Sequence, residues 1–317
     1  MGIFEKGVLG VVVGDALGCP VQFESRNEVK NHPITGMRGY GTFNLPEGSW
    51  TDDSSLTLAL LDSLIMKNGV DLSHVMKNFS NWLLNGEFTP YGYAYDIGGA
   101  TEASIITYIR THDVNTCGRR GENSNGNGSL MRIMPICLYC YAKGMEDSVA
   151  INTIHAVSKL THAHLRSQIA CGLYYFMVKS ILDNDTSLGD RLQKGIDAGF
   201  EFYRKNASEL DYYKRLYRLY DFMNLPDKEI RSSGYVVDTL EAAVWCLVNE
   251  GSFTDTLLRA VNLGDDSDTV GAVCGGLAGL YYGIGGDKGI PYKWIDTLQK
   301  KNLVEVMCTE ADNRLGR

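Results

Sequence analysis

The chain has 317 residues, of which 44% are hydrophobic and 21% are charged, and its formal net charge is −8. This negative balance argues against nucleic acid as the main partner, because binding to phosphates needs basic surface. The glycine-rich apolar runs near the two ends are shorter than the roughly 18–20 residues that cross a bilayer, so we expect no membrane partner.

The spacing of apolar residues predicts an all-α protein, because no segment alternates in the manner of a strand. No Pro/Gly/Ser linker or low-complexity tract divides the chain, so we expect one domain over residues 1-317. The predicted helices cover residues 56–66, 71–85, 101–110, 130–142, 148–160, 166–182, 188–205, 237–249, 253–263 and 270–283.

The first residues lack a basic segment followed by a long apolar run, so we expect neither secretion nor lipidation, and a cytoplasmic location.

Two apolar segments, one near each end of the chain, each carry a stripe of glycines. Glycine inside a helix costs about 0.5–1 kcal/mol relative to alanine, so we predict that two helices approach closely at these faces. The stripes are Gly7, Gly10, Gly14 and Gly18, and Gly271, Gly275, Gly279 and Gly283.

An acidic cluster, Ser49-Trp50-Thr51-Asp52-Asp53, leads directly into an apolar helical segment. Taken alone, it is typical of a helix N-cap, since Thr and Asp accept free backbone N–H groups and suit the positive end of the helix dipole. One cap needs only one such residue. The crowding therefore also allows a metal site, and the two roles can coexist.

Three polar segments in the middle of the chain have both structural and functional interpretations. Residues 95–101 place Asp96 before a glycine turn and a helix, which fits a turn and cap. Residues 123–132 form a glycine-rich loop whose backbone N–H groups could receive a phosphate. His162 and His164 lie between two predicted helices, where a histidine pair is more often structural than ligating.

The eight cysteines are scattered, mostly in apolar helical patterns, which indicates free thiols in a reducing compartment. Cys137 and Cys140 form a single CxxC, which we interpret as core rather than as a zinc or redox site. Tyrosines and basic residues interleave over residues 212–220. We interpret that segment as a solvated amphipathic helix rather than an RNA-binding surface.

A second acidic cluster, Gly264-Asp265-Asp266-Ser267-Asp268-Thr269, precedes the last predicted helix. Unpaired carboxylates packed together cost several kcal/mol unless a cation neutralises them, so two such clusters suggest one shared metal site. Their ligands are hard oxygens without His or Cys, which suits Mg²⁺, Mn²⁺ or Ca²⁺. We therefore expect metal-assisted hydrolysis.

Six ordered segments together resemble the ADP-ribosylglycohydrolase family over almost the whole chain. This resemblance implies a compact all-α orthogonal helical bundle and an enzyme that removes ADP-ribose from a modified acceptor. The segments are Gly14-Asp15-Ala16-Leu17-Gly18, Trp50-Thr51-Asp52-Asp53, Asp96-Ile97-Gly98, Gly126-Asn127-Gly128-Ser129 with Met131-Arg132, Thr161-His162, and Asn262-Leu263-Gly264-Asp265-Asp266-Ser267-Asp268-Thr269.

The resemblance also implies a dinuclear centre of two Mg²⁺ or Mn²⁺ ions, and Asp265 falls outside its ligand positions. The implied metal ligands are Thr51, Asp52, Asp53, Asp266, Asp268 and Thr269. The implied substrate-binding residues, near the diphosphate, are Gly126, Asn127, Gly128, Ser129 and His162.

One position departs from the family pattern. The family often carries an acidic residue where this chain has Gln22, and Gln cannot act as a general base. Either Glu24 replaces it, if the backbone turns that side chain inward, or Asp96 carries the proton transfer.

We therefore expect a monomeric, metal-dependent hydrolase that releases ADP-ribose from an arginine of a modified protein. A serine-linked conjugate or O-acetyl-ADP-ribose is an alternative substrate. A non-catalytic ADP-ribose-binding or structural relative is the second hypothesis, against which the complete ligand sets argue. A di-metal phosphohydrolase is the third, and it would release phosphate without ADP-ribose.

Overall fold

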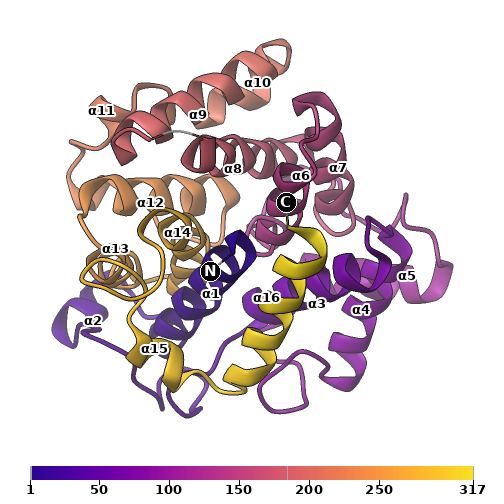
Figure 1. Ribbon diagram of the computed structural model, residues 1–317, viewed down its shortest axis with the longest axis horizontal. Coiled ribbons are helices and arrows are strands. Elements are labelled where there is room, and N and C mark those ends of the chain that lie inside the picture. Colours follow the sequence, from indigo (N-terminus) through magenta and orange to yellow (C-terminus); the bar gives the residue numbers. More distant parts are fainter. Residues whose placement is uncertain (1, 184, 317) are drawn as a thin grey trace.

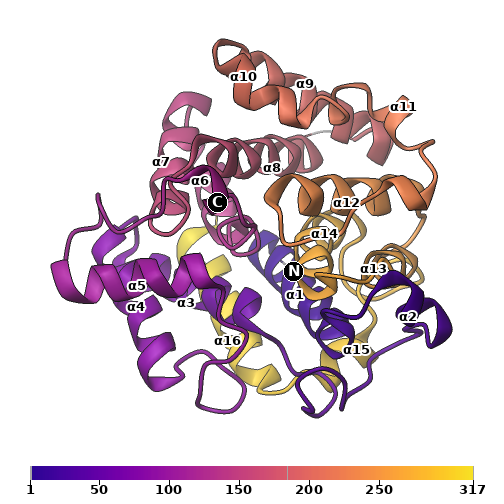
Figure 2. The same cartoon turned by 180° about the vertical axis from the view of Figure 1, so that it is seen from behind.

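The first helix of the chain and one of the last pack against each other at the centre of the molecule. Helix α1 (Ile3–Gly18) lies along α14 (Ser267–Tyr282), as both opposite views show (Figures 1 and 2). In the computed structural model, which describes residues 2–183 and 185–316, both helices are buried on nearly all sides. They form the core around which the other helices are arranged.

The predicted glycine contact is present. A Cβ on Gly10 would lie 2.2 Å from the backbone oxygen of Gly275, and a Cβ on Gly14 would lie 2.1 Å from that of Gly271. Gly279 meets the backbone of α1 in the same way. Gly283 is different: it ends α14 with a φ of +74°, and nothing lies within 4 Å of the place of its Cβ.

The remaining helices surround this pair. From residue 2 to 183 and from 185 to 316 they make an all-α architecture with no sheet, only three isolated β-bridges. After α1 they are α2 (Arg26–Asn31), α3 (Asp52–Lys67), α4 (Leu72–Asn85), α5 (Gly99–Thr111), α6 (Met134–Ala142), α7 (Asp147–Lys159), α8 (Leu165–Asp183), α9 (Leu188–Tyr203), α10 (Ala207–Leu210), α11 (Leu219–Phe222), α12 (Val236–Asn249), α13 (Phe253–Val261), α14, α15 (Tyr292–Thr297) and α16 (Lys301–Leu315).

The C-terminal helix α16 secures the beginning of the chain. The carboxylate of Asp312 accepts the backbone N–H groups of Phe4 and Glu5, at 2.9 and 3.0 Å, and so caps α1.

Within the described ranges, no helix is both long and apolar enough to cross a membrane. All eight cysteines are free and buried, and Cys137 and Cys140 lie in the core on α6, as the sequence indicated.

Two predictions about local structure are wrong. The helix predicted over residues 130–142 begins only at Met134, because Pro135 suits a first turn and the chain before it forms turns in which the Arg132 side chain is fully buried. Residues 212–220 are not one helix but short turns around α10 and α11. Tertiary contacts break the segment there: Tyr213 donates to the Arg166 carbonyl and Arg215 pairs with Glu241.

Candidate functional site

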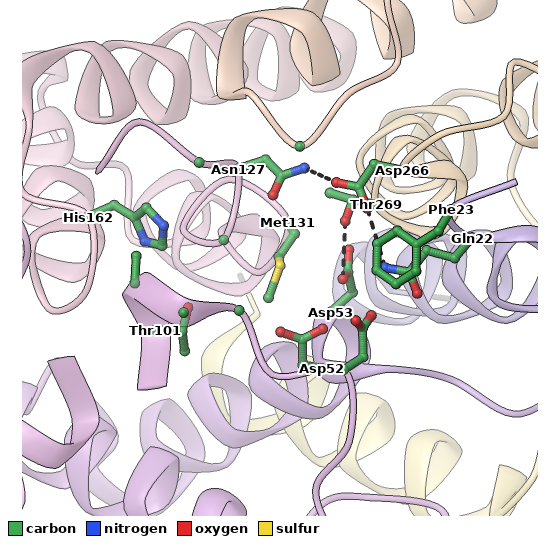
Figure 3. Close-up of a pocket in the computed structure, with 17 residues that line it drawn as sticks. Gln22, Phe23, Asp52, Asp53, Thr101, Asn127, Met131, His162, Asp266 and Thr269 are labelled. Atoms are coloured by element: carbon green, nitrogen blue, oxygen red, sulfur yellow. Dashed lines mark hydrogen bonds between the residues drawn. The ribbon is translucent and has the colours of Figure 1, made fainter. Parts of the chain in front are cut away.

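A pocket lies where the N-terminal ends of α3 and α14 face the glycine-rich loop. It is open to solvent on one side, and the acidic side chains and His162 lie at opposite ends of it (Figure 3). The predicted site residues that line it are Gln22, Asp52, Asp53, Asp96, Gly126, Asn127, Gly128, His162, Asp266 and Thr269. Thr51, Asp268, Ser129 and Glu24 do not line it.

The first acidic cluster begins α3. Thr51 is its N-cap, with an extended backbone, and its hydroxyl accepts the N–H of Asp53 at 3.4 Å. The cap interpretation is therefore correct for Thr51. The carboxylates of Asp52 and Asp53 follow in the first turn and are buried, where the helix dipole favours negative charge.

The second cluster is presented differently. Gly264 and Asp265 both have positive φ, +76° and +56°, and this left-handed turn delivers Asp266 to the start of α14. Asp266 is the N-cap residue, yet its side chain caps nothing. Its carboxylate instead accepts Asn127 Nδ2 at 2.6 Å and Gln22 Nε2 at 3.4 Å, both from the pocket wall.

The two clusters meet at Asp53. The hydroxyl of Thr269 donates to Asp53 Oδ2 at 3.3 Å, and Thr51 Oγ1 lies 3.4 Å from the same oxygen, so the structure brings together acidic residues from the two ends of the chain. The other oxygen of Asp53 and both oxygens of Asp268 are buried without a hydrogen-bond partner. Three carboxylate oxygens thus remain buried and unsatisfied where the two clusters meet.

Burial and mutual repulsion raise the pKa of each of these carboxyls. Loss of hydration is the largest cause for Asp52, Asp53 and Asp268, followed by the charges of their acidic neighbours, and it lifts their pKa well above the ordinary value. Burial together with the charge of Asp266 raises the pKa of Asp96 to about 6, and hydrogen bonding to Gln22 limits that shift. A cation that neutralises these carboxylates would therefore stabilise the folded site.

The donor set fits a hard divalent cation, because carboxylate and hydroxyl oxygens are the available ligands and several of them lack partners. In the described part of the chain, however, no three His, Cys, Asp or Glu side chains converge with the geometry of a metal site. The fit is therefore one of donor chemistry and charge, and not of preformed coordination.

At the opposite end, the glycine-rich loop contributes Gly126, Asn127 and Gly128. Asn127 crosses toward the acidic residues, since its side chain donates to Thr239 Oγ1 as well as to Asp266. Ser129 points into the core, where it bonds to Ser158. His162 packs on the two glycines: a Cβ on Gly128 would lie 2.8 Å from its Cε1 atom.

The two candidates for the acid/base are placed differently. Asp96 lines the pocket on a turn with a φ of +53°. Glu24 is half-buried outside the pocket, where its backbone oxygen accepts the N–H of Asp265 at 2.8 Å. The backbone thus does not turn the Glu24 side chain into this pocket.

Asp15 and Phe23 are among the site residues that sequence reasoning missed. Asp15 on α1 is fully buried and accepts the backbone N–H groups and the hydroxyls of Thr51 and Ser54, with burial raising its pKa to about 7. An acidic residue within an apolar helical run was the available signal. Phe23 lines the pocket with its side chain 66% exposed and a φ of +68°, and nothing in its sequence context indicates this.

Comparison with known proteins agrees with this geometry. Residues 4–316 match the family model described as ADP-ribosylglycohydrolase. The chain is 30% identical over 306 residues to ADP-ribosylarginine hydrolase Tri1 of Serratia proteamaculans (strain 568), covering 96% of this chain and 78% of that protein.

It is also 31% identical over 297 residues to ADP-ribosyl-[dinitrogen reductase] glycohydrolase of Rhodospirillum rubrum, covering 92% and 89% of the two chains. Among solved structures, a chain of an ADP-ribosylglycohydrolase-related protein complex superposes with a TM-score of 0.78 and 29% identity. That match covers 99% of this chain and 98% of the other.

Proposed function

Because the chain belongs to the ADP-ribosylglycohydrolase family, we propose that it hydrolyses the bond between ADP-ribose and an arginine side chain of a modified protein. The observation that supports this most is the two-ended pocket. Its acidic end suits a sugar held beside divalent cations, and its glycine and histidine end suits a diphosphate.

In this proposal the ligands of two Mg²⁺ or Mn²⁺ ions are Thr51, Asp52, Asp53, Asp266, Asp268 and Thr269. When bound, such ions supply positive charge that holds ribose hydroxyls and increases the acidity of water. Thr51 and Asp268 are buried and do not line the pocket, and they would hold the ions together with the lining residues. Asn127 and Gln22 orient Asp266 by donating N–H groups to it.

Asp96 is the proposed acid/base. Its carboxyl lines the pocket beside Gln22 and Asp266, and burial raises its pKa above the ordinary value. It accepts a proton from the attacking water while the bond from the ribose carbon to the guanidine nitrogen breaks. The proton is then delivered to the leaving nitrogen, which gives ADP-ribose and unmodified arginine.

The rim of the pocket favours arginine as the acceptor. Phe23 stands beside the acidic residues and packs against Phe43, which in turn packs against Tyr95, with ring centroids 6.4 and 5.5 Å apart. A cationic guanidinium is attracted both to an aromatic face and to nearby carboxylates. A serine-linked conjugate or O-acetyl-ADP-ribose presents no such charge.

Product analysis tests the proposal. The protein is incubated with ADP-ribosylated arginine, ADP-ribosylated serine and O-acetyl-ADP-ribose, with and without Mg²⁺, and the products are separated by chromatography. Free ADP-ribose from the arginine conjugate, dependent on divalent ions, is the expected result. ADP-ribose from only the other two substrates would reassign the acceptor, and binding without turnover would favour the non-catalytic alternative.

A further inference from the structure

A buried arginine lies behind the phosphate end of the pocket. Arg132 is fully buried between the glycine-rich loop and α4, with its guanidinium carbon 4.7 Å from the centre of the Phe79 ring. Its Nη2 donates to Thr161 Oγ1 at 2.8 Å and its Nη1 donates to the Gly128 carbonyl at 3.3 Å. Both acceptors are neutral, so no bonded carboxylate cancels the positive charge.

The hydrogen bond from Arg132 fixes the direction of the next one. Thr161 Oγ1 also lies 2.8 Å from His162 Nδ1. Arginine can only donate, so the threonine oxygen accepts from Arg132 and keeps its single hydrogen for His162. If Nδ1 carried a proton instead, Thr161 Oγ1 would accept hydrogen bonds from both Arg132 and His162. The hydrogen of this fully buried hydroxyl would then have no acceptor among these two neighbours, which costs stability. His162 Nδ1 is therefore the acceptor.

The other ring nitrogen of His162 faces the loop that lines the pocket. A Cβ on Gly126 would lie 3.5 Å from Nε2, and one on Gly128 would lie 3.3 Å from it. Burial, and then the charge of Arg132, lower the pKa of His162 to about 3, so the ring is neutral near pH 7. A neutral ring whose Nδ1 accepts a hydrogen bond must carry its proton on Nε2.

We propose that Arg132, acting through Thr161, holds His162 as a neutral ring with its proton on Nε2, which faces the pocket to donate to a phosphate oxygen of ADP-ribose. The role of the phosphate rests on the proposed function. Arg132 and Thr161 are then positioning residues. The charge that attracts the diphosphate comes from Arg132 behind the wall, while the donor in contact with it is uncharged and fixed in direction.

Nuclear magnetic resonance of the whole protein with ¹⁵N-labelled histidine tests the tautomer directly. The His162 signals are identified as those lost in His162→Gln. At about pH 7 we expect a protonated Nε2 and an unprotonated Nδ1. A protonated Nδ1 in the wild type, alone or in a charged ring, would overturn the proposal. This measurement does not depend on what the protein hydrolyses.

Calorimetric binding of ADP-ribose tests the connection to the ligand. Thr161→Val keeps the shape of the side chain and removes the hydroxyl, and we expect it to weaken binding by about 3–10-fold, the worth of one hydrogen bond. Thr161→Ser keeps the hydroxyl and should stay within about twofold of the wild type. Equal affinity for wild type and Thr161→Val would refute the relay. A wild type that binds no ADP-ribose refutes the proposed function instead, and the spectrum still decides the tautomer.

Discussion

The Asp15 carboxylate accepts both the backbone N–H and the hydroxyl of Thr51, with the shortest of these contacts at 3.0 Å. Through this contact the central helix α1 sets the position of the first turn of α3. The Asp15 carboxylate also accepts hydrogen bonds from Ser54 and does not line the pocket. Asp15 therefore supports the first turn of α3 from behind the pocket.

We expect Asp15→Asn to destabilise the protein by about 1–3 kcal/mol and to lower activity strongly, because the new amide group would face N–H and O–H donors in a buried site. Thermal unfolding and turnover measure the two effects. Asp71→Asn is the matched control. Asp71 caps α4 at the surface, accepting the N–H of His74 at 3.0 Å, and Asn caps a helix as well as Asp does. Equal losses in both variants would remove the special role of Asp15.

Removal of divalent ions should destabilise the protein more at about pH 8 than at about pH 5. Folding raises the pKa of Asp96 to about 6 and that of Asp15 to about 7, so the stability these carboxyls contribute is complete below the unfolded value near 3.9 and is lost as the pH rises through 6 and 7. Bound cations offset that loss. Melting temperatures with a chelator and with Mg²⁺, at both pH values, measure the difference.

A paired substitution checks that the effect comes from the acidic centre. Asp266→Asn should reduce the Mg²⁺-dependent stabilisation and most of the activity while leaving the helical fold intact. Asp265→Asn changes the exposed neighbouring residue, and we expect it to alter neither the Mg²⁺-dependent stabilisation nor the activity. A melting temperature that does not change with Mg²⁺ at either pH value would contradict the proposal that these acidic residues bind divalent ions.

Asp96→Asn should lower the turnover number by about 10²–10⁴-fold, the usual worth of a general acid/base, with little change in affinity for ADP-ribose. Steady-state kinetics and equilibrium binding separate these two quantities. Glu24→Gln should stay within a few-fold of the wild type, since Glu24 does not line the pocket. The reverse pattern would assign the proton transfer to Glu24.

Gln22→Glu examines the departure from the family. Gln22 donates to Asp266, and a carboxylate in its place would remove that donor and add repulsion. We therefore expect kcat/KM to fall. A large gain would show that the natural chain is a weakened catalyst.

Gly275→Ala should cost about 1–3 kcal/mol of stability, and Gly275→Leu more, because even a Cβ would lie 2.2 Å from the Gly10 carbonyl oxygen and force α1 and α14 apart. Chemical denaturation measures this. Gly251→Ala is the control, as nothing lies within 4 Å of that position and it is exposed. Unchanged stability in Gly275→Ala would mean that the helices can separate without cost.

Phe23→Leu should raise KM for ADP-ribosylated arginine by about 3–30-fold, the range of a cation–π contact, and leave KM for O-acetyl-ADP-ribose nearly unchanged. Phe23→Tyr keeps the aromatic face and should behave as the wild type. Parallel kinetics on the two substrates provide the comparison. An equal change for both would show that Phe23 shapes the pocket without selecting the acceptor.

The two acidic clusters, residues 49–53 and 264–269, could be recognised from the sequence because the residues of each cluster are adjacent and precede a helix. The two helix starts could be recognised from Thr51 and from the segment leading to Thr269. The all-α architecture followed from apolar spacing for the amphipathic helices. The helix at residues 7–18 was indicated by its glycine stripe and not by apolar spacing, since these residues are buried all round and show little periodicity.

Other features depend on contacts that no local pattern records. Whether Glu24 turns inward is decided by backbone bonds between residues 23–24 and Asp265. The short turns around α10 and α11 follow from where Tyr213 and Arg215 find partners on other helices. The bond from Arg132 to Thr161 joins positions that only the folded chain brings together.

The packing of α1 on α14 also bears on how this protein is made. Helix α1 precedes α14 by most of the described chain, so its largest packing partner is synthesised late, after α3 and α6, which also contact α1. Until α14 is made, the face of α1 that carries Gly10 and Gly14 lacks the helix it packs against. A fragment that ends before Ser267 lacks α14, and with it Asp268 and Thr269 of the second acidic cluster.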